Sequence, residues 1–382
     1  MSERHVVVVG GGAAGAAAAL AAHASGARVT VVLGKTGATS LTSGAIDGEL
    51  DDDAKSIASA LDLWTFERAK IATSAGTLRA THGRDRALAD LDASKGAVLV
   101  ARVAHPAWDA RALAASYAET DARGFVADDV ALVVNEAERA MRHAELAALH
   151  DDPARLAVAA DRIKQALARG TYGAVLLPPW LGARGAHASE LSALVGVPCG
   201  EVLVAFDGPA GLRFEHARDR SLQHARISTL KSRVKRVAQT DAACAVDLDD
   251  GAALEADAVV LATGGVLAGG IAYTPGEAAF ARAMPPPSRA PFALGYDAPV
   301  TLGHDGHAFV VPGSVFGVAP ESIALRAPGE RDTLLERVGV LVDSRLRASD
   351  RVFACGDALE GHARTIASAI ATGVAAGRAA AA

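Results

Sequence analysis

Short apolar runs and glycine breaks alternate along the opening of the chain and predict a β-α-β unit. Val6 to Val9 is a continuous β-branched run, which is typical of a strand buried on both faces. The Ala-rich stretch after three successive glycines predicts a helix that continues to about Ser25, where Gly26 ends it. Residues 28–33 (RVTVVL) then predict the second strand.

Matching elements lie near the other end of the chain. Residues 257–265 (DAVVLATGG) and 351–357 (RVFACGD) each predict a buried strand that runs into a small-residue turn, and residues 365–380 predict a helix. We therefore predict an α/β protein with a Rossmann-like FAD/NAD(P)-binding fold, three-layered around a mainly parallel sheet. Its nucleotide domain is discontinuous, formed by residues 1–50 and 231–382, and residues 51–230 form an inserted α+β domain.

Within that insert the hydrophobic period changes from segment to segment. Residues 136–148 and 153–169 predict amphipathic helices. Residues 174–177 predict a buried strand that ends at Pro178-Pro179.

Composition and charge exclude several classes of protein. The 382 residues are 51% hydrophobic, and the net charge of −6 comes from interspersed acids and bases. That pattern lacks the basic face that nucleic acid or anionic lipid would require. The three cysteines, Cys199, Cys244 and Cys355, have no metal-ligand spacing, which argues against zinc, an iron–sulfur cluster or a dithiol site, so no metal is expected.

The first residues imitate a secretion signal, because an apolar stretch follows Arg4 and His5 and precedes Ala22-His23-Ala24. Glycines interrupt this stretch where a signal would need continuous apolar helix. No other segment has the uninterrupted apolar length of a membrane span. We therefore expect a soluble, cytoplasmic protein.

The glycine-rich turn fits the pattern G-x-G-x-x-G at the end of a strand. Gly10 would allow the tight turn, Gly12 would let a pyrophosphate approach the backbone, and Gly15 would let the helix lie close to the strand. The amides of Ala13 and Ala14, at the positive end of the helix dipole, would then face the phosphates. The alternative interpretation is a Gly-rich turn that binds no nucleotide, in a protein that is rich in alanine throughout.

The acidic residue that usually binds the adenosine ribose is missing from the end of the second predicted strand. Leu33 stands there, and Lys35 follows close by. Three explanations remain open: another group holds the ribose of FAD, the ligand is FMN, or the site has decayed.

Two further segments favour a flavin over NAD. Gly356-Asp357 follows an apolar strand, where the carboxylate could accept hydrogen bonds from a ribityl chain, although Asp is also common in turns. Ala262-Thr263-Gly264 forms a second small-residue turn. The hydroxyl-rich loop 39–48 could also lie along the flavin and pyrophosphate, with Ser40, Ser43 and Gly44 as contacts. The alternative is a polar loop with ST-turns.

Together with Pro198-Cys199-Gly200, FEHARDRSL (214–222), ATGGVLAGGI (262–271) and GVLVDSRL (339–346), these motifs resemble the B subunit of anaerobic glycerol-3-phosphate dehydrogenase. That family belongs to the fumarate-reductase-like FAD-dependent oxidoreductases. The resemblance covers most of the chain, but only the nucleotide motifs are specific.

The resemblance implies a complex that oxidises sn-glycerol 3-phosphate to dihydroxyacetone phosphate and passes electrons to quinone. It implies two partners, an FAD-containing catalytic subunit and an iron–sulfur membrane-anchor subunit, which would hold this chain at the inner face of the membrane. It also implies a flavin here, FAD or alternatively FMN.

Direct substrate oxidation would need a base and a cation beside the flavin ring. His362 and Arg364 are the best-placed catalytic candidates, and His304 and His307 come second. Two rival hypotheses stay open: a stand-alone FAD-dependent oxidoreductase of another small substrate, and a structural subunit without flavin.

Overall fold

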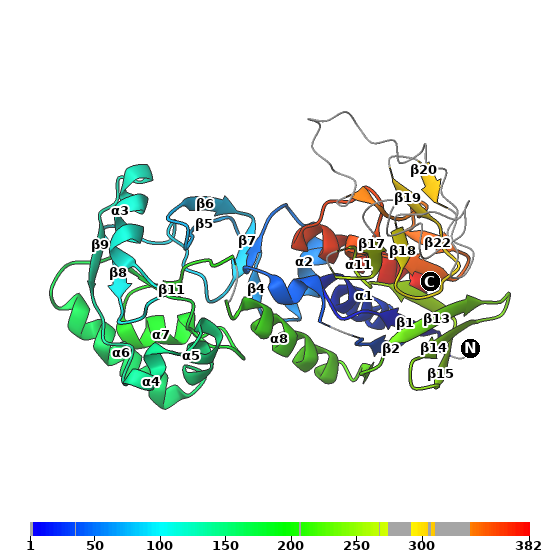
Figure 1. Ribbon diagram of the computed structural model, residues 1–382, viewed down its shortest axis with the longest axis horizontal. Coiled ribbons are helices and arrows are strands. Elements are labelled where there is room, and N and C mark those ends of the chain that lie inside the picture. Colours follow the sequence, from blue (N-terminus) through cyan, green and yellow to red (C-terminus); the bar gives the residue numbers. More distant parts are fainter. Residues whose placement is uncertain are drawn as a thin grey trace, which may run out of the picture. The chain divides into compact units, whose positions relative to one another are not determined.

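The computed structural model describes residues 3–34, 36–205, 208–266, 268–273, 292–304, 307–309 and 337–382. The chain forms two compact units, coloured by sequence in Figure 1. Unit 1 contains residues 1–39, 50–58 and 220–382, and unit 2 contains residues 40–49 and 59–219.

Unit 1 is built around a six-stranded sheet in which strands from both ends of the chain are neighbours. All its neighbouring strands pair in parallel except the last two, which are antiparallel. All five residues of its central strand are buried, as the apolar run predicted. The Rossmann-like α/β fold is thereby confirmed. In spatial order the strands are β12 (Ser228–Leu230), β2 (Arg28–Val32), β1 (His5–Val9), β16 (Ala258–Leu261), β23 (Val352–Ala354) and β22 (Arg347–Ser349).

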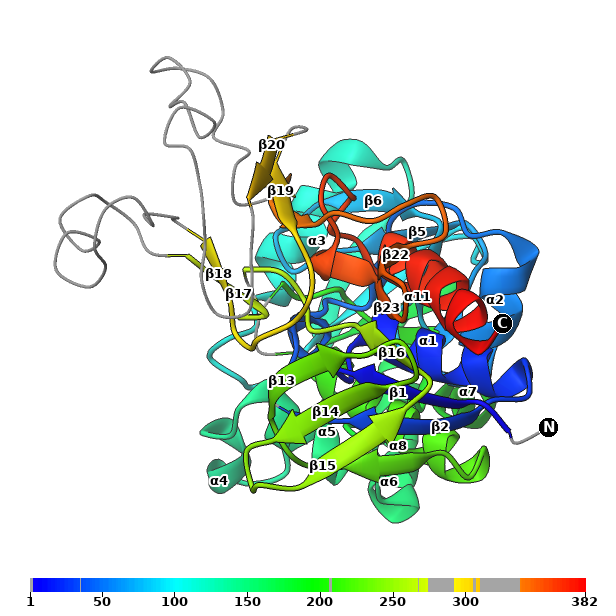
Figure 2. The ribbon, with the colours of Figure 1, turned by 90° about the vertical axis from the view of Figure 1, so that its right-hand side faces the viewer.

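Two different layers cover the faces of this sheet (Figure 2). The helices α1 (Ala13–Ala24) and α11 (Ile366–Ala381) pack against one face. The antiparallel sheet of β13 (Val234–Gln239), β14 (Cys244–Leu248) and β15 (Ala253–Ala256) packs against the other. Val7 and Val9 share a buried apolar cluster with Val237 and Val246 of that sheet, because alternate residues of a strand point to opposite faces.

Small residues allow α1 and α11 to touch at the backbone. A Cβ atom added at Gly373 would lie 2.3 Å from the carbonyl oxygen of Ala14, and one at Gly377 would lie 2.2 Å from that of Ala18. The two glycines lie one helical turn apart and so form one continuous contact. The helices can therefore approach only because these positions carry no side chain.

The compact units differ from the predicted division at their boundaries. Residues 220–230 belong to unit 1 because β12 pairs with β2, and residues 50–58 belong there too, with Asp53 paired to Arg378. The remaining elements of unit 1 are α2 (Asp52–Ser59), β17 (Ile271–Tyr273), β18 (Phe292–Leu294), β19 (Leu302–His304), β20 (His307–Phe309), β21 (Gly339–Val340) and η3 (Gly356–Ala358).

Unit 2 contains a second parallel sheet, of four strands, in the order β11 (Cys199–Glu201), β10 (Ala174–Leu177), β8 (Val98–Arg102) and β9 (Phe125–Asp129). Its main helices are α3 (Ala110–Thr120), α6 (Pro153–Leu167) and α7 (Ala188–Val195). Short antiparallel strands complete it, namely β3 (Ala45–Ile46), β4 (Trp64–Thr65), β5 (Ala69–Ala72), β6 (Leu78–Thr81) and β7 (Gly83–Asp85), with the turn η1 (Ala38–Leu41) and the helix α8 (Ala210–His224) at its chain boundaries.

The single helix predicted over residues 136–148 is wrong. The chain forms α4 (Glu136–Arg139) and then α5 (His143–Leu149). The break has a physical cause, because the carbonyl of Met141 accepts a hydrogen bond from the His105 ring at 2.9 Å instead of continuing a helix. The backbone amide of Arg142 donates to the Glu145 carboxylate and starts the second helix. The neighbouring helix and the buried strand at 174–177 form as predicted.

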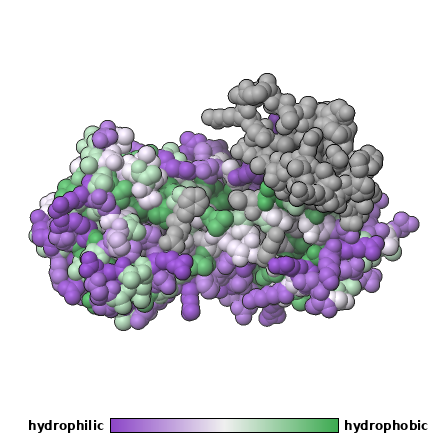
Figure 3. All heavy atoms as spheres, in the orientation of Figure 1, coloured by the Kyte–Doolittle hydropathy of each residue, from purple (hydrophilic) through white to green (hydrophobic). Residues whose placement is uncertain are grey.

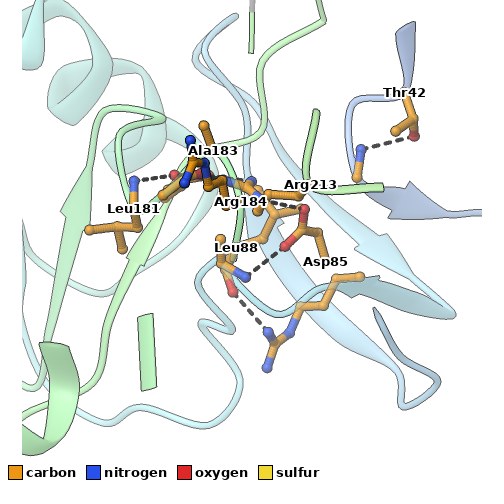
Figure 4. A network of polar contacts seen from close by, with 12 residues as sticks. Thr42, Asp85, Leu88, Leu181, Ala183, Arg184 and Arg213 are labelled. Carbon is orange, nitrogen blue, oxygen red and sulfur yellow. Dashed lines mark hydrogen bonds and ion pairs between the residues drawn. The ribbon is translucent and has the colours of Figure 1, made fainter. Parts of the chain in front are cut away.

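A fully buried ion network joins three elements of unit 2 (Figure 4). Arg213 on α8 donates to Asp85 on β7 at 2.8 Å and to Glu201 on β11 at 2.8 Å. It also donates to the carbonyl of Gly182 at 2.7 Å. All three charged side chains are about 1% exposed, and this guanidinium forms an ion pair with both carboxylates.

We expect Arg213→Met to destabilise the protein by about 3–5 kcal/mol, because it removes the cation that pairs with both buried carboxylates. Urea unfolding followed by circular dichroism measures the loss. Arg162→Met, on the exposed face of α6, is the matched control and should change little. Equal stability of the two variants would contradict this account of the network.

Candidate nucleotide-binding site

The loop after β1 has the shape that the glycine pattern predicts. Gly10 has a φ of +114°, and a Cβ atom there would lie 2.2 Å from the carbonyl oxygen of Ala262. Gly12 is the N-cap of α1 and has extended backbone, so the helix begins directly after it. The turn therefore lies where the strand gives way to the helix, at the carboxyl end of the sheet.

The three motif glycines have different local roles. A Cβ atom at Gly15 would lie 2.0 Å from the carbonyl oxygen of Gly10, so both positions exclude a side chain by packing. A Cβ atom at Gly12 would meet only the hydroxyl of Thr39, at 3.1 Å. Gly12 is half-buried and has an ordinary φ of −73°. Of these three glycines, Gly10 and Gly15 are required by close backbone packing, whereas the missing side chain of Gly12 leaves space beside the turn.

The first turn of α1 offers amide groups to an anion. The amide of Ala13 donates to the hydroxyl of Thr39 at 3.0 Å. The amides of Ala14 and Gly15 also lack an acceptor within the helix, as first-turn amides do. No acidic side chain lies in this turn to oppose an anion. The sequence places Thr39 in the hydroxyl-rich loop but does not reveal this contact, because the helix that it touches begins 26 residues earlier.

The loop after β16 lies against the same turn. Ala262 is buried beside Gly10, and Gly264 has a φ of +76°. The hydroxyl of Thr263 hydrogen-bonds that of Tyr296 at 2.9 Å. Burial raises the pKa of Tyr296 to about 12, so its phenol stays neutral at physiological pH.

The loop after β23 lies beside the loops after β1 and β16. Gly356 has a φ of +64°, and a Cβ atom there would lie 2.6 Å from the Cβ of Ala14. Its amide donates to the hydroxyl of Thr372 on α11 at 2.9 Å. The predicted residues from β1, β16 and β23 thus meet at one edge of the sheet.

Asp357 follows in this loop with a half-buried carboxyl group. Burial raises its pKa, and the nearby Arg364 guanidinium partly opposes that rise. Among the described residues no hydrogen-bond donor is recorded for this carboxylate. It is therefore an acceptor with capacity for the hydroxyl groups of a ligand.

The two catalytic candidates lie close to this loop in the sequence but differ in environment. Arg364 donates to the carbonyl of Val338 at 2.7 Å. His362 is exposed, and its Nδ1 atom lies 2.9 Å from the carbonyl oxygen of Glu360. The backbones of His304 and His307 pair in a hairpin, and their side chains lie outside the described part. A catalytic role for any of them stays a prediction.

The remaining predicted cofactor contacts fall in three places. Leu33 is half-buried, and its amide donates to the carbonyl of Leu230 at 2.7 Å. Lys35 lies outside the described residues. Ser40, Ser43 and Gly44 belong to unit 2, where Ser40 donates to the Glu215 carboxylate and the amide of Gly44 donates to the hydroxyl of Thr42 (Figure 4).

Comparison with known proteins supports the class of fold. Residues 212–266, which include Ala262 and Gly264, match a protein family described as FAD-NAD(P)-binding. The match covers far less than half of the chain and agrees with the predicted class of cofactor. No curated protein sequence matches this chain.

Many solved structures resemble the chain at low identity. An oxidoreductase from Agrobacterium tumefaciens is 10% identical over 99% of this chain and 97% of its own, with a TM-score of 0.35. CtdE, solved in complex with FAD, is 12% identical over 97% and 82%, with a TM-score of 0.33. The peptidyl tryptophan dihydroxylase QhpG is 14% identical over 95% of this chain, with a TM-score of 0.32, and this chain spans 62% of its length.

The described residues contain neither a metal-binding cluster nor a membrane-spanning helix. No three His, Cys, Asp or Glu side chains there form a group that could hold a metal ion. No described helix combines the length and the apolar character needed to cross a bilayer. On the face in Figure 3, hydrophilic and hydrophobic side chains are interspersed over unit 2.

We expect Asp357→Asn to stabilise the flavin-free protein at pH 7. Because the pKa of Asp357 is raised in the folded state, the folded carboxyl keeps its proton to higher pH than the unfolded one. The wild type therefore loses stability as the pH rises from the unfolded-state pKa through the folded-state pKa. Below about pH 3.9, the ordinary pKa of Asp, the two proteins should converge. The midpoints of urea unfolding of the two proteins, taken at a series of pH values, measure this difference in stability. The exposed Asp350→Asn is the control, and an Asp357→Asn effect that is equal at all pH values would contradict it.

Proposed function

We propose that this chain is an FAD-dependent oxidoreductase whose unit 1 binds the dinucleotide at the carboxyl ends of β1, β16 and β23. The observation that carries the proposal is the position of Gly12. It caps the N-terminus of α1 and leaves space beside helix amides that have no acceptor within the helix. A helix N-terminus that opens from such a turn is the standard binding site of a pyrophosphate.

The residues present fit this cofactor. The amides of Ala13 and Ala14 would bind the pyrophosphate, with the helix dipole behind them. The hydroxyl of Thr39, which accepts from Ala13, could rotate and donate to a phosphate oxygen. The carboxylate of Asp357 would accept hydrogen bonds from ribityl hydroxyls. The flavin ring, when bound, supplies the redox chemistry, and the protein orients it.

FAD is favoured over FMN by the same turn, because a glycine-rich loop of this pattern serves a dinucleotide pyrophosphate. Leu33 directly follows β2 and provides no carboxylate, so the adenosine ribose would have to be held by another group. Chromatography of the nucleotide released by heating the purified protein distinguishes FAD, FMN and no flavin.

The finer proposal is that the chain is the B subunit of an anaerobic glycerol-3-phosphate dehydrogenase. The resemblance of its nucleotide motifs to that family supports it. Its partners would then be an FAD-containing catalytic subunit and an iron–sulfur membrane-anchor subunit, and it would lie peripherally at the inner face of the cell membrane. Reduction of its flavin by sn-glycerol 3-phosphate only when the partners are present would favour this assignment. Reduction by a substrate without them would favour a stand-alone oxidoreductase.

We expect Gly12→Ala to weaken FAD retention about tenfold or more while the protein still folds. The added methyl group meets only the Thr39 hydroxyl, and it projects where the pyrophosphate would approach the backbone. Flavin content per protein and the dissociation constant from titration of the stripped protein measure the effect, and circular dichroism verifies the fold.

Gly124→Ala in unit 2 is the matched control, since its methyl group would meet only the Cβ of Ala97 at 3.6 Å. It should keep full flavin content. A Gly12→Ala protein that retains FAD like this control would reject the proposed site.

A further inference from the structure

Unit 2 has the topology of a small doubly wound sheet. The chain leaves β8 through α3 toward β9, at one edge, and leaves β10 through α7 toward β11, at the other edge. In Figure 1, α3 lies on one side of the strands of this sheet, and α6 and α7 lie on the other. β8 and β10 are neighbours, so the direction of winding reverses between them. In open parallel sheets, ligands bind outside the carboxyl ends of the strands at this reversal.

Three loops converge at that point. His105 follows β8, Trp180 follows β10, and His143 lies in the segment after β9. The rings of His105 and Trp180 meet edge to face, with centroids 5.4 Å apart. The indole of Trp180 donates to Nδ1 of His143 at 2.9 Å. All three side chains are buried, so they form a fixed aromatic base.

An open cavity of about 530 Å³ lies between the loop after β8, which includes His105, and the helix α4 with its C-cap. Its volume falls within the roughly 300–1,000 Å³ of small-molecule sites. Its lining combines a mainly apolar wall with one ion pair, in which Arg139 donates to Glu136 at 3.0 Å. The residues that line it are Val103, Ala104, His105, Pro106, Glu136, Arg139 and Ala140.

The lining indicates the chemistry of a ligand. Both ring nitrogens of His105 are engaged, with Met141 and with the amide of Ala107, so the ring offers apolar surface rather than a free donor. Arg139 is the cation of the lining, and its side chain is 52% exposed. A guanidinium forms bidentate hydrogen bonds with a carboxylate or phosphate, and an incoming anion could replace the exposed Glu136.

We infer that unit 2 has a second ligand site, between the loop after β8 and α4, for a small organic anion with an apolar body. The apolar body lies on Val103, Ala104 and Pro106, and the anionic group pairs with Arg139. This site lies within unit 2 and is separate from the nucleotide site proposed in unit 1.

The probe is 8-anilinonaphthalene-1-sulfonate, an aromatic sulfonate whose fluorescence rises on binding, titrated into the purified full chain after saturation with FAD. We expect one saturable site, displaced by naphthalene-2-carboxylate and not by the neutral naphthalene-2-carboxamide. Arg139→Gln should raise the dissociation constant about tenfold, because the variant loses a charge-assisted pair with the ligand. Arg162→Gln, an exposed arginine on α6 outside the cavity lining, should leave it unchanged.

Ala104→Trp is the second variant, because it fills the cavity without changing charge and should abolish saturable binding. Ala104 is exposed, so the fold should survive, which thermal unfolding checks. Equal affinity in the wild type, Arg139→Gln and Ala104→Trp would overturn the inference, as would equal displacement by the carboxylate and the amide. Neither result depends on Gly12, so failure here and failure of the FAD proposal are distinguishable.

Discussion

Unit 1 depends on one steric constraint, the close approach of backbone to backbone where its strands end. The loop after β1 passes so near the carbonyl of Ala262 that Gly10 can carry no side chain, and the start of α1 passes equally near Gly10 itself. These contacts bring the carboxyl ends of β1 and β16 together and let α1 begin directly after Gly12, with its first turn buried. In the proposed site an anion would be bound by main-chain amides, and the nearby side chains of Thr39 and Asp357 would only adjust that binding.

The two units share one architectural feature but differ in the residues of their loops. Each has a parallel sheet whose strand ends gather loops from distant parts of the sequence. In unit 1 those loops are rich in glycine and alanine, and the loop after β1 leads into the first-turn amides of α1. In unit 2 they carry His105, His143 and Trp180, which fill the space between them with rings. The first arrangement suits phosphate, and the second suits an apolar body with a single charge.

The parts of the fold that rest on local pattern could be predicted from the sequence. The β-branched run of β1, the glycine turn, β10 and the strands after Asp257 and Arg351 all form where periodicity and turn residues place them. The break between α4 and α5 could not be predicted, because it depends on a hydrogen bond from His105, which lies 36 residues from Met141. The buried network was equally hidden, since 128 residues separate Arg213 from Asp85. The candidate site follows the same division: its glycines could be predicted, whereas its Thr39 contact and the environment of Asp357 required coordinates.

The contact of α1 with α11 has a consequence for the order of events during synthesis. Domains generally fold as units as the chain emerges. Most of unit 2 is one continuous stretch, residues 59–219, so its sheet can form while the ribosome is still translating unit 1. The Ala-rich face of α1 stays uncovered until Gly373 and Gly377 have been made. The first strand and helix therefore lack this packing until the last helix has been synthesised.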